Sequence, residues 1–178
     1  MMPLCADNRA RRCIEQNAKL SLRETLKASR KHKICYKPIS PMSKILITGA
    51  SGFVGSFLVE KALELGFDTW AVLRKTSSKE YLTDPRIHFI ELDLGDDAVL
   101  AQQLRTHAAE HGAFDYVIHA AGATKAPNEA AFRRTNTEGT LRLARTLLDL
   151  QLLNGRFVFV SSLSVVGAVA ENPIRQAD

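Results

Sequence analysis

Three glycines at every third position mark the segment TGASGFVG, Thr48 to Gly55. The apolar run KILIT precedes them, and the amphipathic run FVGSFLVEKALELG follows. Gly49 would let the chain leave a strand in a tight turn, Gly52 would let a ligand approach the backbone, and Gly55 would let a helix pack against the strand. The pattern predicts a strand, turn and helix whose free N–H groups attract phosphate. A tight turn without a ligand is the alternative.

Strand and helix patterns alternate along the chain from Lys44. The expected strands are 44–48, 68–74, 86–92, 115–122 and 156–162, and the expected helices are 53–66, 96–112 and 128–151, the last weakened near Gly139. Such alternation predicts a parallel sheet with helices on both faces, and near-continuous apolar strands support it. We therefore expect an α/β fold, a doubly wound sheet of about five strands in the order 3-2-1-4-5.

Composition changes abruptly at Met42. Residues 1–41 hold ten of the 24 basic residues but three of the 19 acidic ones, so the net charge of +5 comes from this segment. We expect a basic, disordered extension over 1–41 and a globular domain over 42–178. Other interpretations of 1–41 stay open: translation that starts at Met42, a transit peptide, or a basic arm that binds nucleic acid or acidic lipid.

Several classes of protein are disfavoured by what the sequence lacks. The part after residue 41 has no basic bias that would suggest nucleic acid, and no apolar run approaches the ~18 residues that span a membrane. All three cysteines precede Met42 without CxxC spacing, which disfavours a disulfide framework or a metal site. We therefore expect neither nucleic acid nor a membrane as partner, no metal, and a reducing, cytoplasmic location.

Four motifs follow one another in the globular part. They are GxxGxxG at Gly49–Gly55, HAAG at His119–Gly122, NTEGT at Asn136–Thr140 and SSLSVVG at Ser161–Gly167. With them, Lys44 to about Gly167 resembles the extended short-chain dehydrogenase/reductase superfamily, which includes the NAD-dependent epimerase/dehydratase family and reductase branches. The resemblance implies a Rossmann-like NAD(P)-binding domain over 42–178, with hydride transfer on a sugar nucleotide or another hydroxy or carbonyl substrate. A non-catalytic dinucleotide-binding or redox-sensing module is the alternative.

The resemblance also assigns residues to the dinucleotide. Asp93 would bond the adenine amino group and Leu94 would cover the ring, although Asp93, or rather Asp96, could instead cap the next helix. Asn136 would stabilise the region below the nicotinamide. The remaining backbone and small-residue contacts would come from Gly49, Ser51, Gly52, Phe53, Val54, Gly55, Ala120, Ala121 and Gly122. We interpret His119 as a packed strand residue rather than a catalytic one.

The choice between NADP and NAD depends on the end of the second strand. Leu73 stands where NAD-binding members carry an acid, and Arg74 and Lys75 follow it. Cationic groups suit a ribose 2′-phosphate, which an acid would repel. We expect NADP rather than NAD; a solvated loop is the alternative for Arg74 and Lys75.

Only some of the catalytic residues of the resembled superfamily have a counterpart in this sequence. By resemblance Ser162, five residues before Gly167, would hydrogen-bond the reacting oxygen of an unknown small-molecule substrate, with Ser164 as the fallback. A turn in which these serines satisfy backbone groups is the alternative.

The family's base is the tyrosine of a YxxxK motif, and none of the three tyrosines has a lysine four positions on. We expect a domain truncated at its C-terminus that binds cofactor with weak or no turnover. A longer form could pair as a homodimer through TLRLARTLLDL.

Overall fold

The sheet has the strand order expected from the sequence. A computed structural model describes residues 42–162. Five parallel strands form one sheet in the order β3-β2-β1-β4-β5. The strands are β1 Lys44–Thr48, β2 Asp68–Leu73, β3 His88–Glu91, β4 Phe114–His119 and β5 Leu153–Phe159. The predicted doubly wound α/β class is therefore confirmed.

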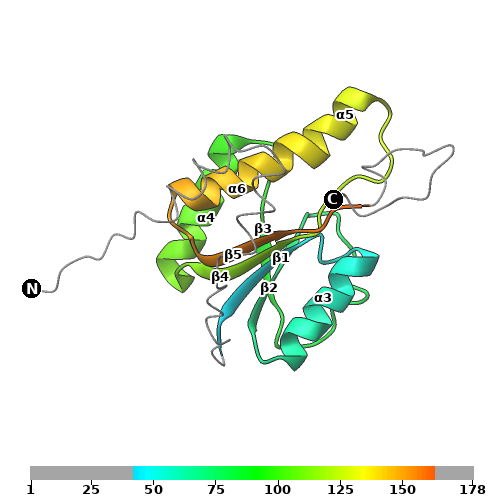
Figure 1. Cartoon of the computed structure of the whole chain (residues 1–178). Coiled ribbons are helices and arrows are strands. Elements are labelled where there is room, and N and C mark those ends of the chain that lie inside the picture. Colours follow the sequence, from blue (N-terminus) through cyan, green and yellow to red (C-terminus); the bar gives the residue numbers. More distant parts are fainter. Residues whose placement is uncertain (1–41, 163–178) are drawn as a thin grey trace, which may run out of the picture. The chain divides into compact units, whose positions relative to one another are not determined.

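Helices lie on both faces of the sheet (Figure 1). Helix α3, Phe53–Glu64, covers one face, and helices α4, Asp97–His111, and α6, Gly139–Asp149, cover the other. Alternate side chains of β1 point to opposite faces: Ile45 and Ile47 pack against α3, and Leu46 packs against α4 and α6.

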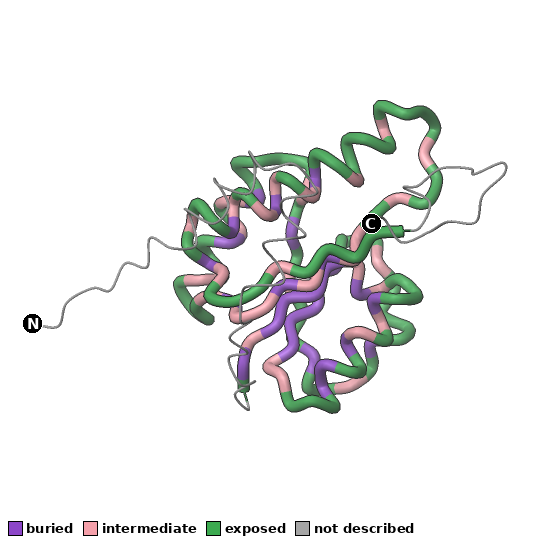
Figure 2. Tube along the Cα trace, viewed as in Figure 1, coloured by how far each residue is buried: buried purple, intermediate pink, exposed green. Residues whose placement is uncertain are grey.

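Burial concentrates in the central strands, as Figure 2 shows. Each fully buried leucine or isoleucine contributes about 1.5–3 kcal/mol, so the two apolar faces of β1 hold the sheet between its helices. Within the described residues no helix is both long and apolar enough to span a membrane.

The last strand begins three residues earlier than the sequence indicated, at Leu153 instead of Arg156. The strand includes Gly155, which the expected range leaves out. A Cβ on Gly155 would stand 2.2 Å from the Asp115 carbonyl oxygen, so only glycine allows β5 to pass β4 there. The pairing shifts register at this point.

The expected helix 128–151 is interrupted. It consists of α5, Glu129–Arg133, a π-helical turn η1, Arg134–Glu138, and then α6. The predicted weak point, Gly139, lies at the end of that turn. π-helical turns inside helices are frequent at functional sites, and this one carries Asn136.

Candidate functional site

The residues singled out in the sequence gather at one edge of the sheet. Parallel strands place all their carboxyl ends together, and ligands of such sheets bind outside those ends. The glycine-rich turn follows β1, and the paired cations at 74–75 follow β2. Residues 93–94 follow β3, residues 120–122 follow β4, and Ser162 follows β5.

The glycine-rich turn is packed directly against the loop after β4. Gly49 has φ 69°, a left-handed conformation that glycine adopts without strain. A Cβ on Gly49 would stand 2.6 Å from the Ala120 carbonyl carbon, and one on Gly55 would stand 2.0 Å from the Gly49 carbonyl oxygen. The close approach of β1, α3 and the β4 loop therefore requires glycine at both positions.

The N-terminus of α3 is open to an anion. Its first residues, Phe53 and Val54, are exposed, and Ser51 before them is half-buried. The capping residue is Gly52, no side-chain hydrogen bond caps the helix, and its first turn has no acid. The free N–H groups can therefore donate hydrogen bonds to a phosphate, and the positive end of the helix dipole attracts it.

Two exposed cations follow the end of β2. Leu73 is buried at the strand end, so no acid stands there. The Arg74 N–H donates to Ser77 Oγ at 3.1 Å, which forms a turn, and the Lys75 ammonium lies 3.9 Å from the Glu91 carboxylate of β3. Arg74 and Lys75 form a positive group that Glu91 offsets in part.

The loop after β3 shows which of two aspartates, Asp93 or Asp96, caps helix α4. Asp96 is the N-cap of α4, and its carboxylate accepts from the Val99 N–H at 2.9 Å. Asp93 is exposed, and its Oδ1 accepts from the Gly95 N–H at 2.7 Å. The Leu94 carbonyl accepts from Arg142 of α6 at 2.6 Å, which fixes the loop. Capping thus belongs to Asp96, and Asp93 faces solvent at the strand end.

Asn136 holds the loop after β4 from the π-helical turn. Its Oδ1 accepts from the Ala123 N–H at 2.7 Å, and its Nδ2 donates to the Ala123 carbonyl at 2.9 Å. A Cβ on Gly122 would stand 3.2 Å from the same Oδ1. Asn136 therefore acts on backbone geometry, and the loop stays close to the turn because Gly122 has no side chain.

Three side chains that the sequence did not assign to the site join these parts. His119, at the end of β4, is 1% exposed. Its Nδ1 lies 2.6 Å from Thr48 Oγ1, and its Nε2 lies 2.9 Å from Thr140 Oγ1. Burial lowers the pKa of His119 to about 4, so the ring is neutral at pH 7. The available signal is a threonine and a histidine at the ends of two apolar strands, and a threonine at the start of α6.

Ser162 is exposed beyond β5. The Val160 N–H donates to the His119 carbonyl at 3.0 Å, so the chain still runs beside β4 as it leaves the strand. The fallback, Ser164, lies outside the described residues. Among residues 42–162, no group of three or more His, Cys, Asp or Glu side chains is arranged to hold a metal ion.

A glycine-rich turn and an uncapped helix N-terminus, at the carboxyl edge of a parallel sheet ordered 3-2-1-4-5, define a Rossmann-like domain. The model of the NAD dependent epimerase/dehydratase family matches residues 45–178. The chain belongs to this family, and with it to the extended short-chain dehydrogenase/reductase superfamily.

Individual relatives agree with this assignment. Mouse UDP-glucose 4-epimerase is 30% identical over 156 residues, which cover 76% of this chain and 42% of the relative. UDP-glucose 4-epimerase of Klebsiella pneumoniae is 32% identical over 136 residues, 70% of this chain and 92% of that sequence. The Bordetella bronchiseptica enzyme WbmH, solved in complex with NAD+, superposes with a TM-score of 0.58 at 28% identity, over 75% of this chain and 43% of WbmH. The chain thus spans about two fifths of the mouse enzyme and of WbmH.

Proposed function

We propose that this chain binds a nicotinamide dinucleotide at the carboxyl edge of its sheet, as the cofactor-binding part of an extended short-chain dehydrogenase/reductase. The observation that carries the proposal is the turn with Gly49, Gly52 and Gly55. It leads into the N-terminus of α3, which has no side-chain cap and no acid in its first turn. The diphosphate would lie there, because free N–H groups and the helix dipole both favour an anion.

The residues present fit such a cofactor. Gly52 is exposed, so its missing side chain leaves space above the turn. Exposed Asp93 offers a carboxylate to the adenine amino group, and Ala120, Ala121 and Gly122 offer a surface without large side chains. When bound, the nicotinamide supplies hydride transfer; the residues of this chain bind and orient it.

For the ribose we propose NADP rather than NAD. Arg74 and Lys75 are exposed at the end of β2, and buried Leu73 stands in place of an acid. These cations would attract a 2′-phosphate. Glu91, 3.9 Å from Lys75, opposes this preference and reduces its size. WbmH, in which the bound cofactor is NAD+, is a relative and leaves the choice in this chain open.

Titration of the full chain with NADPH and with NADH tests both proposals. We expect NADPH to bind more tightly. Replacing Arg74 and Lys75 together by alanine should weaken NADPH at least about tenfold, because two charge-assisted contacts are lost, and should leave NADH unchanged.

The matched control removes one positive charge elsewhere. Arg105→Ala, on the exposed surface of α4, should change neither affinity. If the wild-type chain binds NADPH and NADH equally and the double variant does so too, the proposed NADP preference is contradicted. Failure of the wild-type chain to bind either dinucleotide would remove the proposed function.

The reaction is proposed from Ser162 and from the family. Ser162 is exposed at the carboxyl edge, and we propose that its hydroxyl bonds the hydroxyl or carbonyl oxygen of a sugar nucleotide or similar substrate. No tyrosine of this sequence has the lysine partner of a YxxxK base. Loss of a general base costs about 10²- to 10⁴-fold, so binding without rapid turnover is the expected behaviour of these 178 residues. Full-rate turnover by them with any substrate would contradict this.

Two further properties belong to the proposal. The leucines Leu141 and Leu148 are exposed seven residues apart on α6, which supports pairing with a second copy. Sedimentation that finds monomers at every concentration would contradict a dimer.

A cytoplasmic location is proposed from the absence of cysteine after residue 41, and fractionation of cells tests it.

A further inference from the structure

The hydrogen bonds around His119 define which of its nitrogens carries the proton. Thr140 Oγ1 donates to the Asn136 carbonyl oxygen at 2.7 Å. A hydroxyl has one hydrogen, so Thr140 can only accept from His119 Nε2, which lies 2.9 Å away. His119 Nε2 must therefore carry a hydrogen.

The other nitrogen follows by the same reasoning. The ring is neutral, so Nδ1 has a lone pair and accepts. The hydroxyl of Thr48, 2.6 Å from Nδ1, then donates to it. Thr48 Oγ1 also accepts from the Ala121 N–H at 3.2 Å, so each of its polar functions has a partner.

These bonds hold the first residues of the loop after β4 from two sides. Ala121 is held by Thr48, at the end of β1, and Ala123 is held by the side chain of Asn136. His119 joins the two sides, because Thr48 bonds one of its nitrogens and Thr140, bonded to the Asn136 backbone, bonds the other. The start of this loop, at Ala120 and Ala121, packs on Gly49.

We propose that His119 is a positioning residue, held in its Nε2–H tautomer, which keeps the loop after β4 and the glycine-rich turn in the arrangement that binds the dinucleotide. The inference rests on the proposed function for its ligand. It differs from a packing role, because packing needs the shape of the ring, whereas positioning needs an acceptor toward Thr48 and a donor toward Thr140.

The tautomer is read first, by ¹⁵N NMR of the histidine rings in the full chain without dinucleotide. The His119 signals are identified by their loss in His119→Asn. We expect a protonated Nε2 and an unprotonated Nδ1 at pH 7. Thr140→Val removes the acceptor and should shift the ring toward the Nδ1–H form, whereas Thr140→Ser keeps the hydroxyl and should retain the wild-type tautomer.

Dinucleotide affinity is then compared in two variants. The amide of asparagine lies near the place of Nδ1 and can accept from Thr48; the amide of glutamine reaches the place of Nε2 and leaves Thr48 without its acceptor. We expect His119→Gln to bind the dinucleotide at least about fivefold more weakly than His119→Asn, the effect of one unmade buried hydrogen bond. Unfolding measurements on both variants show whether affinity merely follows stability.

Each outcome decides the matter. An Nε2–H tautomer that responds to Thr140→Val, with the expected order of affinities, supports the proposal. An Nδ1–H or cationic ring at pH 7 overturns it without any reference to cofactor. The expected tautomer with wild-type affinity in both variants overturns the positioning role. A wild-type chain with the expected tautomer that binds no dinucleotide overturns the proposed function, and the positioning role with it.

Discussion

At the scale of single residues, the glycines of the turn have different physical reasons to be glycine. Gly49 combines a positive φ with a backbone neighbour 2.6 Å from the place of a Cβ. Gly66, after α3, has a similar φ of 78° with nothing within 4 Å of that place. The two positions therefore separate backbone strain from crowding.

Replacing each of these glycines by alanine measures the difference. Gly66→Ala should lower the free energy of unfolding by about 1–2 kcal/mol, the cost of a left-handed alanine. Gly49→Ala should cost at least about 3 kcal/mol, because overpacking against Ala120 adds to the strain. Urea unfolding followed by circular dichroism measures both, and equal losses would show that the β4 loop yields to the added methyl group.

At the scale of elements, the sequence predicts the strands and helices that depend on residues close together in the chain. The run KILIT, the glycines after it and the amphipathic helix each follow from short-range rules, so β1, the turn and α3 were predicted. The start of β5 was missed because Gly155 is needed for a contact with Asp115, 40 residues earlier in the chain. The roles of Thr48 and Thr140 were missed for the same reason, since their common partner, His119, is distant in sequence.

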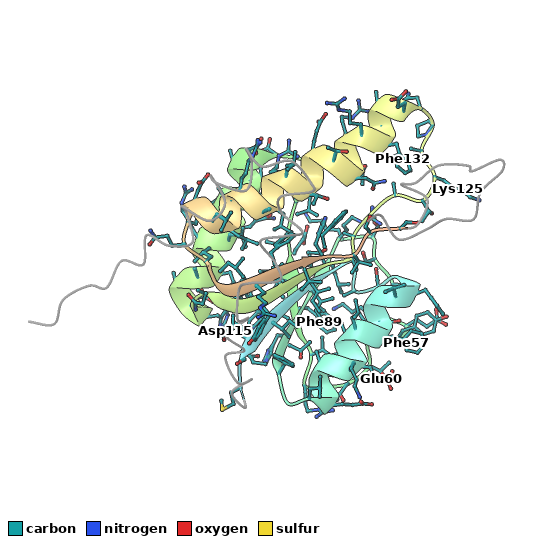
Figure 3. All side chains as sticks on the ribbon, in the orientation of Figure 1. Phe57, Glu60, Phe89, Asp115, Lys125 and Phe132 are labelled. Carbon is teal, nitrogen blue, oxygen red and sulfur yellow. The ribbon has the colours of Figure 1, made fainter. Side chains whose placement is uncertain are left out.

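The interruption of the last helix is tied to the site. The π-helical turn Arg134–Glu138 carries Asn136, whose side chain makes two bonds to Ala123. Figure 3 shows Phe132 on α5 and Lys125 on the loop after β4, both outside the sheet. The side chain of Asn136 therefore joins the π-helical turn to the loop after β4.

Asn136→Ala should release that loop. Two partly buried bonds are lost, so the free energy of unfolding should fall by about 1–3 kcal/mol, and hydrogen exchange at the Ala123 amide should accelerate. Asn128→Ala, which removes the N-cap bond to Ala131, is the matched control: about 1 kcal/mol is lost without a change at Ala123. Similar exchange at Ala123 in both variants would show that Asn136 does not hold the loop.

At the scale of the whole described domain, two histidines are buried on the same face of the sheet. His119 lies at the carboxyl edge, between the Phe157 and Phe159 rings of β5 and Thr140 of α6. His107 of α4 packs against Trp70 and Phe114. Both lie on the α4 and α6 side, so the face covered by α3 contributes no buried histidine among the described residues.

These two histidines make stability depend on pH. Burial lowers the pKa of His119 to about 4; burial, with the nearby His111 and Lys44, lowers that of His107 to about 4. The unfolded chain binds their protons near pH 6.5 and the folded chain only near pH 4, so between these values the unfolded state holds more protons. The free energy of unfolding should therefore fall as pH falls from about 6.5 to 4, by up to about 1.4 kcal/mol per pH unit for each histidine, and these contributions should level off below that range.

Urea unfolding between pH 4 and 8, followed by circular dichroism, measures this dependence. The exposed pair of Asp84 and Arg86 affects only the acid end of this range, because Arg86 lowers the pKa of Asp84 from 3.8 to about 2 and the contribution of the pair is lost as pH falls toward these values. His107→Phe removes one of the two protons and keeps a ring against Phe114, so it should halve the histidine contribution to the slope while leaving His119 in place. A free energy of unfolding that stays constant from pH 6.5 to 4 would show that the folded domain opens to protonate both rings at no cost, which is incompatible with their burial.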